Sequence, residues 1–249
     1  MAINTEKNLY TVLFATGMVI VVGSLLAFVA SSLKPTISEN ERLEKQQNIL
    51  YAMGVNNNEG GSDVAFISTD EVTEEFNKYI KKQIVIQGEN ITEDSEAYTI
   101  DIKKEADKAK DPSYERKLPL FIGEKDGETV YVVPMRGKGL WDAIWGYMAL
   151  DENMVVKGVF FDHKGETPGL GANIKERFFM DDFSGEQTLS NNNFRGVNVA
   201  KGNADPLNKV KDDNEVDAIA GATITGNGVS AMINKDLQLY LPYFKSLKK

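Results

Sequence analysis

The N-terminal part of the chain contains a long apolar run that predicts a membrane-spanning helix. No charged residue occurs between Lys7 and Lys34, and the apolar core extends from Leu9 to Ala30. About twenty apolar residues are enough for a helix to cross the hydrocarbon layer of a bilayer. A cleaved signal peptide would have a shorter apolar region, of about 7–15 residues, and a small-residue cleavage site. We therefore expect residues 1–34 to form an uncleaved, single-pass anchor.

The charges that flank this run leave its orientation open. Lys7 precedes the run, whereas Lys34, Arg42 and Lys45 follow it. A count of basic residues therefore favours a cytoplasmic location for the following part of the chain. Long segments are translocated largely regardless of charge, however, and the following segment is long.

Residues 35–117 are polar and predict a mostly helical connecting region within the soluble part. Ser38 begins a Ser-x-x-Glu capping pattern, and Gly54 marks the expected end of that helix. A second helix is expected to start near Thr69 and to carry its apolar residues, as far as Ile80, on one face.

From Leu118 onward, short apolar segments with intervening turns predict an antiparallel sheet. Asp126-Gly127 separates two such segments, and this dipeptide favours the tight turns that match strand twist. Ala143, Trp145, Tyr147 and Ala149 alternate, which favours a strand at 143–149, with a short helix as the alternative. The further expected elements are a strand at 154–161, a helix at 172–179, a strand at 194–199 and an amphipathic helix at 229–244. We therefore predict an α+β fold, in which residues 118–249 form a domain with a mainly antiparallel sheet and flanking helices.

The composition excludes several kinds of function. A net charge of −9 argues against nucleic acid as a partner, because no basic face is evident. The absence of cysteine excludes disulfides, thiolate metal ligands and a cysteine nucleophile. His163 is the single histidine, which excludes a histidine-based metal cluster. Any redox chemistry would therefore come from a cofactor.

The stretch 217–230 combines a short apolar run, a small-residue turn and the start of the last predicted helix. The first amides of a helix lack intrahelical partners and point outward, so such a turn can bind an anion. Thr223 and Thr225 supply two hydroxyls there. The alternative is that Thr225 or Asn227 only caps the helix, since Thr and Asn are common N-caps.

A second constrained segment follows the strand expected at 154–161. Pro168 and neighbouring glycines indicate a constrained, closely approached loop, although the glycines could also serve the turn alone. Nearby, Trp141 and Trp145 could stack on a ligand, but a place in the core is the more common role of a large aromatic residue.

Three motifs resemble the FMN-binding domain family. Gly221–Thr225 is similar to its Gly-Ala-Thr-x-Thr flavinylation motif, and Gly139–Trp141 and Glu166–Gly171 occur in the same order as in that family. Two positions depart from the motif: Ala220 stands where Ser or Asp is usual, and Gly226 stands where Ser is frequent. Neither departure removes the acceptor hydroxyl.

The resemblance implies one covalent FMN per chain, attached to Thr225 through a phosphoester. Given such an FMN, we expect Leu170 to lie against the ring and Thr167 to be a polar contact. We expect the amides of Gly221, Ala222 and Thr223 to hold the phosphate. Glu166, Gly169 and Trp145 complete the candidate cofactor-binding residues; no residue is expected to be catalytic by itself, and no metal site is expected.

Among the members of this family, the C subunits of bacterial Na+-translocating NADH:quinone oxidoreductases resemble this chain over the N-terminal anchor as well as over the soluble domain. This resemblance implies an anchor in the inner membrane, a soluble domain in the periplasm and a flavin transferase as the partner during maturation. It also implies that the chain relays electrons between other membrane subunits of a complex that oxidises NADH, reduces ubiquinone and exports Na+. Two alternatives stay open: the G subunits of Rnf electron-transport complexes, and a non-redox, membrane-anchored binding or assembly module.

Overall fold

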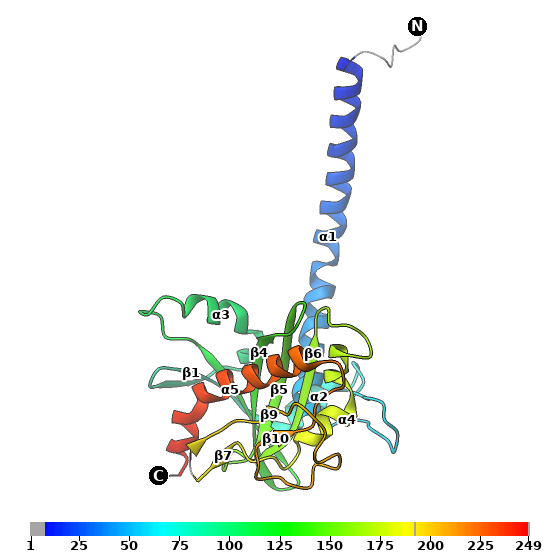
Figure 1. Cartoon of the computed structure of the whole chain (residues 1–249). Coiled ribbons are helices and arrows are strands. Elements are labelled where there is room, and N and C mark those ends of the chain that lie inside the picture. The colour runs from blue at the N-terminus through cyan, green and yellow to red at the C-terminus, as the bar shows by residue number, and fades with distance from the viewer. Residues whose placement is uncertain (1–7, 192, 249) are drawn as a thin grey trace. The chain divides into compact units, whose positions relative to one another are not determined.

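The computed structural model describes residues 8–191 and 193–248, and the chain divides into two compact units between Arg42 and Leu43 (Figure 1). In chain order the elements are α1 (Asn8–Ala52), α2 (Val72–Tyr79), β1 (Ile80–Gln87), β2 (Asn90–Glu93), η1 (Ala97–Thr99), α3 (Ile102–Lys108), β3 (Leu118–Lys125), β4 (Glu128–Lys138), β5 (Ala143–Leu150), β6 (Val156–His163), η2 (Gly171–Lys175), α4 (Arg177–Met180), η3 (Asp181–Phe183), β7 (Leu189–Ser190), β8 (Asn193–Phe194), β9 (Asn198–Val199), β10 (Glu215–Val216) and α5 (Thr223–Ser246).

Helix α1 is long and apolar enough to cross a membrane, as the apolar run predicts. The expectation of a separate helix from Ser38 is wrong, because α1 continues through Pro35 to Ala52. Proline removes one backbone hydrogen bond, but the helix continues on both sides of Pro35. The predicted end at Gly54 is close: its φ of 76° lies in the left-handed region that favours glycine.

The second unit is built on a six-stranded sheet with the order β2-β1-β3-β4-β5-β6. Every neighbouring pair in it is antiparallel, so the predicted α+β class with a mainly antiparallel sheet is confirmed. The predicted β3–β4 hairpin is also present. Asp126 and Gly127 both have positive φ, of 53° and 80°, as the tight turn requires.

Neighbouring residues of β6 mark the two covered faces of the sheet. The ring of Phe161 contacts Phe179 and Phe183, from α4 and η3. The ring of Phe160 contacts Tyr51 and Phe66 on the opposite face, because successive side chains of a strand alternate. Helix α5 packs against β4 and β5 (Figure 1).

Several expected elements differ from the observed ones. Ile80 starts β1 instead of ending a helix, and both β1 and β2 lie in the region expected to be mostly helical. The helix expected at 172–179 is two short helical segments, and the strand expected at 194–199 is interrupted at Gly196, where φ is 68°. The boundary between residues 117 and 118 stays a prediction; the sheet contains strands from both sides of it.

A buried carboxylate fixes α5 against the sheet. Asp236 is 1% exposed, and its Oδ2 accepts a hydrogen bond of 2.8 Å from the backbone amide of Arg136 in β4. Its Oδ1 lies 3.3 Å from Nη1 of Arg116. Because a buried charge is costly unless it is paired, these contacts set the position of α5 along β4.

A second buried carboxylate, Glu186, lies in the loop after η3. It is fully buried and accepts a hydrogen bond of 2.9 Å from Asn208 Nδ2, and Lys211 Nζ lies 3.7 Å away. Burial outweighs these two favourable contacts and raises the pKa of Glu186 to about 7. The folded chain therefore keeps a proton that the unfolded chain releases near the ordinary value of 4.5.

Because the pKa of Glu186 is raised in the folded chain, we expect the free energy of unfolding to fall as the pH rises. The contribution of protonated Glu186 to the free energy of unfolding is complete below the unfolded-state pKa and is lost as the pH rises through the folded-state pKa. The total loss is at most about 3 kcal/mol. We expect Glu186→Gln to remove this dependence. The check is the free energy of unfolding at pH 5 and pH 8 in the detergent-solubilised chain. The exposed control Glu152→Gln should keep the wild-type slope, and an identical slope in Glu186→Gln would contradict the assignment.

Candidate functional site

The candidate site is centred on a hydrogen bond between two residues far apart in the sequence. Thr225 Oγ1, in the first turn of α5, donates to Glu166 Oε2 at 2.6 Å. Both residues are buried, with 1% and 4% of their surfaces exposed. The contact therefore joins the loop after β6 to the start of the last helix.

The Glu166 carboxylate is held by the loop between β4 and β5. Its Oε1 accepts the amides of Trp141 at 2.9 Å and Asp142 at 3.5 Å, and its Oε2 accepts the amide of Leu140 at 3.3 Å. Burial alone disfavours the charged form, but the bonds from Thr225 and the three amides outweigh it and lower the pKa of Glu166. The site therefore contains a buried carboxylate anion.

His163 supports the same loop. It ends β6, and its Nδ1 accepts a hydrogen bond of 3.1 Å from the amide of Glu166. Its Nε2 is buried and has no hydrogen-bond partner among the described residues. His163 therefore positions the backbone of Glu166 at the start of the loop.

Gly171 allows the loop backbone to touch the Glu166–Thr225 pair. A Cβ atom at this position would lie 2.4 Å from Thr225 Oγ1 and 2.6 Å from Glu166 Oε2. Both distances are shorter than contacts to a real Cβ. Only glycine therefore fits here without displacing one member of the pair.

The start of α5 has the geometry of an anion site. Gly221 adopts a φ of 71°, and Ala222 occupies the N-cap position without a side-chain cap. The first amides of the helix, from Thr223 onward, therefore lack an intrahelical or side-chain acceptor. The alternative that Thr225 or Asn227 caps this helix is wrong, because the helix begins at Thr223.

Exposed apolar side chains surround the buried pair. Leu140, Trp141, Leu170 and Ile224 are 43%, 66%, 41% and 57% exposed. Trp141 is thus not a core residue, since its indole Nε1 instead donates to Thr167 Oγ1 at 3.1 Å on the surface. A Cβ atom at Gly221 would lie 2.8 Å from a methyl group of Leu170, so the Leu170 side chain lies close to this glycine. An exposed apolar patch around a polar centre is typical of a binding site.

The structure brings together most of the predicted site residues and separates one of them. Those that gather at the loop after β6 and the start of α5 are Glu166, Thr167, Gly169, Leu170, Gly221, Ala222, Thr223 and Thr225. Trp145 pairs with Asp162 in the sheet, on the face of Phe160, whereas His163 lies on the other face. Trp145 therefore points away from the Glu166–Thr225 pair.

Two features of the site were not predicted from the sequence: the three amides that bind Glu166, and the role of His163. A backbone amide leaves no residue-type signal, so the Gly139–Trp141 motif marked the loop without indicating that its amides bind Glu166. A Cβ at Gly139 would lie 2.6 Å from Glu166 Oε1. The departure at Gly226 also has a reason in packing, since a Cβ there would lie 3.0 Å from Val199 Cγ1.

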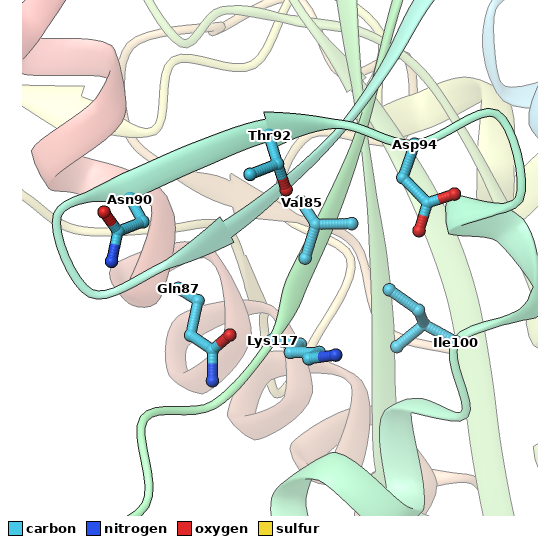
Figure 2. Close-up of a pocket in the computed structure, with 7 residues that line it drawn as sticks. All are labelled: Val85, Gln87, Asn90, Thr92, Asp94, Ile100 and Lys117. Carbon is cyan, nitrogen blue, oxygen red and sulfur yellow. The ribbon is translucent and has the colours of Figure 1, made fainter.

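The described residues contain no group of three potential metal ligands, and a small pocket lies elsewhere on the sheet. Figure 2 shows its lining residues, which come from β1, β2 and the segments before β3: Val85, Gln87, Asn90, Thr92, Asp94, Ile100 and Lys117. None of these residues belongs to the Glu166–Thr225 site.

The close approach at Gly171 gives a stability prediction. Gly171→Ala should break the Glu166–Thr225 hydrogen bond and leave two buried polar groups poorly paired, at a cost of about 1–3 kcal/mol. Gly165→Ala in the same loop is the matched control, because a Cβ there meets no atom within 4 Å. It should change stability by less than about 0.5 kcal/mol. Urea unfolding of both variants is the measurement, and equal losses would contradict the role of Gly171.

Comparison with known proteins points to the same region of the chain. The FMN-binding domain family model matches residues 139–238. The C subunit of the Na(+)-translocating NADH-quinone reductase from Pseudomonas aeruginosa is 31% identical, with 93% of this chain and 92% of that protein covered. The corresponding protein from Vibrio anguillarum is 27% identical, with 92% and 90% covered.

Solved structures agree with the sequence relatives. The crystal structure of the C subunit of the Na(+)-translocating NADH-quinone reductase from Parabacteroides distasonis is 29% identical, with 85% of this chain and 96% of that chain covered and a TM-score of 0.71. That of NqrC from Shewanella oneidensis is 27% identical, with 83% and 99% covered and a TM-score of 0.65. The chain therefore belongs to the family of Na(+)-translocating NADH-quinone reductase C subunits.

Proposed function

We propose that this chain carries FMN covalently on Thr225 and relays electrons within a membrane-bound, Na+-translocating NADH:ubiquinone oxidoreductase. The observation that carries the proposal is the Thr225 hydroxyl, which lies at the start of α5 and contacts the Glu166 carboxylate at 2.6 Å. The relatives named as subunits of such a complex support the assignment to it. In this proposal the chain itself binds neither nicotinamide nor quinone.

The residues at this site fit an FMN phosphoester. The amides of Gly221 and Thr223 lie at the start of α5, where the helix dipole and the first helical N–H groups favour a phosphate. The amide of Ala222 instead donates to the carbonyl oxygen of Ile219 at 3.0 Å. Thr225 supplies the ester oxygen. Leu170 supplies an apolar surface beside Gly221, and Thr167 supplies a hydroxyl next to Trp141.

Bound FMN supplies the one- and two-electron redox chemistry that the side chains of this protein lack. A phosphoester leaves the flavin ring unchanged, so its reduction potential depends on non-covalent neighbours. Leu170 and Trp141 would limit access of water to the ring, and Thr167 would offer it a hydrogen bond. The covalent link prevents loss of the cofactor and makes its binding intramolecular.

In this proposal α1 spans the inner membrane and the second unit lies in the periplasm. The apolar residues of α1 and its length support the membrane span. The partners would be the other membrane subunits, which supply and accept the electrons. A flavin transferase that uses FAD and Mg²⁺ would attach the FMN during maturation.

Removal of the acceptor hydroxyl tests the attachment site. Thr225→Ala should abolish covalent flavin, because the ester oxygen is lost, while the chain stays folded. Thr129→Ala is the control, since it removes an exposed threonine hydroxyl in β4, outside the site. Intact mass after co-expression with a flavin transferase is the measurement, with one FMN less water expected in the wild type and the control. Full modification of Thr225→Ala would refute the site.

The cysteine-free sequence allows a direct test of topology. Glu89→Cys places one thiol on the exposed turn after β1, and Thr5→Cys places one before the apolar run. A membrane-impermeant maleimide added to intact cells with a permeable outer membrane should label Glu89→Cys and spare Thr5→Cys. Lysed cells are the control, in which both variants should react. Labelling of Thr5→Cys alone in intact cells would contradict the periplasmic location.

A further inference from the structure

We propose that Glu166 is the general base for modification of its own chain, an inference that rests on the proposed attachment of FMN to Thr225. Thr225 Oγ1 attacks the phosphorus that bears the flavin in FAD and forms the Oγ1–P bond. The P–O bond to the AMP half breaks, and AMP leaves with the electron pair. The hydroxyl proton passes to Glu166 Oε2, so that no oxidant or reductant is required.

The two carboxylate oxygens of Glu166 have different surroundings. Oε1 accepts the closest loop amide, from Trp141 at 2.9 Å, which anchors the side chain. Oε2 accepts the hydroxyl of Thr225 at 2.6 Å, within reach for proton transfer, and also accepts the amide of Leu140 at the longer distance of 3.3 Å. A general base must lie within hydrogen-bond reach of the proton that it takes. Glu166 meets this condition before any other molecule binds.

The burial of Thr225 favours a base from this chain over one from the transferase. The residue is 1% exposed, and the backbone of Gly171 lies against its hydroxyl. The Leu170 side chain lies beside Gly221, next to the start of α5. With Glu166 already in contact with Oγ1, the reaction needs only one new neighbour at that oxygen.

Transfer of the proton to Glu166 also removes a repulsion in the product. The phosphodiester carries a negative charge, and an ionised carboxylate at the present distance from Oγ1 would oppose it. A protonated Oε2 instead donates a hydrogen bond to the ester. The amides at Oε1 keep their acceptor in both protonation states, and the first amides of α5 face the phosphate.

The rate of attachment tests the proposal. The full-length chain, made without a flavin transferase and purified in detergent, is mixed with purified transferase, Mg²⁺ and excess FAD, and intact mass is followed over time. Glu166→Gln keeps the size and polarity of the side chain but cannot accept the proton. We expect its attachment to be at least about 100-fold slower than in the wild type, the usual contribution of a general base.

The control for loss of a buried carboxylate is Glu105→Gln. Glu105 is 5% exposed and also accepts a backbone amide, from Lys117, but it lies in α3 outside the site. This variant should be modified at the wild-type rate. Circular dichroism and the thermal midpoint of each variant separate a loss of chemistry from a loss of fold.

Glu166→Asp is the second test, since it keeps the charge that the loop amides bind but withdraws the carboxylate from Oγ1 by one methylene. It should be folded and at least about ten-fold slower, with a measurable residual rate. A folded Gln or Asp variant that is modified at the wild-type rate overturns the role of Glu166 as base. Failure of the wild type to acquire flavin, or modification away from Thr225, would instead refute the proposed attachment.

Discussion

The hydrogen bond between Thr225 and Glu166 is the contact on which the rest of the site depends. A carboxylate with 4% of its surface exposed must be supplied with donors, because an unpaired buried charge is strongly destabilising. Its donors come from the β4–β5 loop and from the start of α5. These two segments and the loop after β6 must therefore all be in place before Glu166 can be buried as an anion.

Two buried carboxylates hold helix α5, in addition to hydrogen bonds such as that from the Tyr240 hydroxyl to the Pro119 carbonyl oxygen at 2.9 Å. Asp236 ties the middle of the helix to the Arg136 amide of β4, and Glu166 holds its first turn through Thr225. Two contacts on one helix determine both its position along the sheet and its rotation about its own axis. The hydroxyl of Thr225 and the first amides of α5 are consequently oriented by the sheet, through Asp236, and by the loop that carries Glu166.

The parts of the fold that could be predicted from the sequence are those with local signals. The Asp126-Gly127 turn identified the β3–β4 hairpin, and alternation identified β5. Strand β1 was missed because Ile80 follows Tyr79 of α2 directly, without a glycine or proline to mark the change. In the site, the motif residues near Thr225 were found. The amides that bind Glu166 were not, because any residue type supplies an amide and only the folded loop directs it.

Trp145 shows that closeness in the sequence does not place a residue in the site. It stands four residues after Trp141, yet the alternation of β5 places it on the face of Phe160, away from Thr225. Trp141 precedes the strand and stays at the surface, where its indole contacts Thr167. A shift of one residue in a strand changes the face that a side chain covers. The contribution of an aromatic residue to this site is therefore decided by where β5 begins.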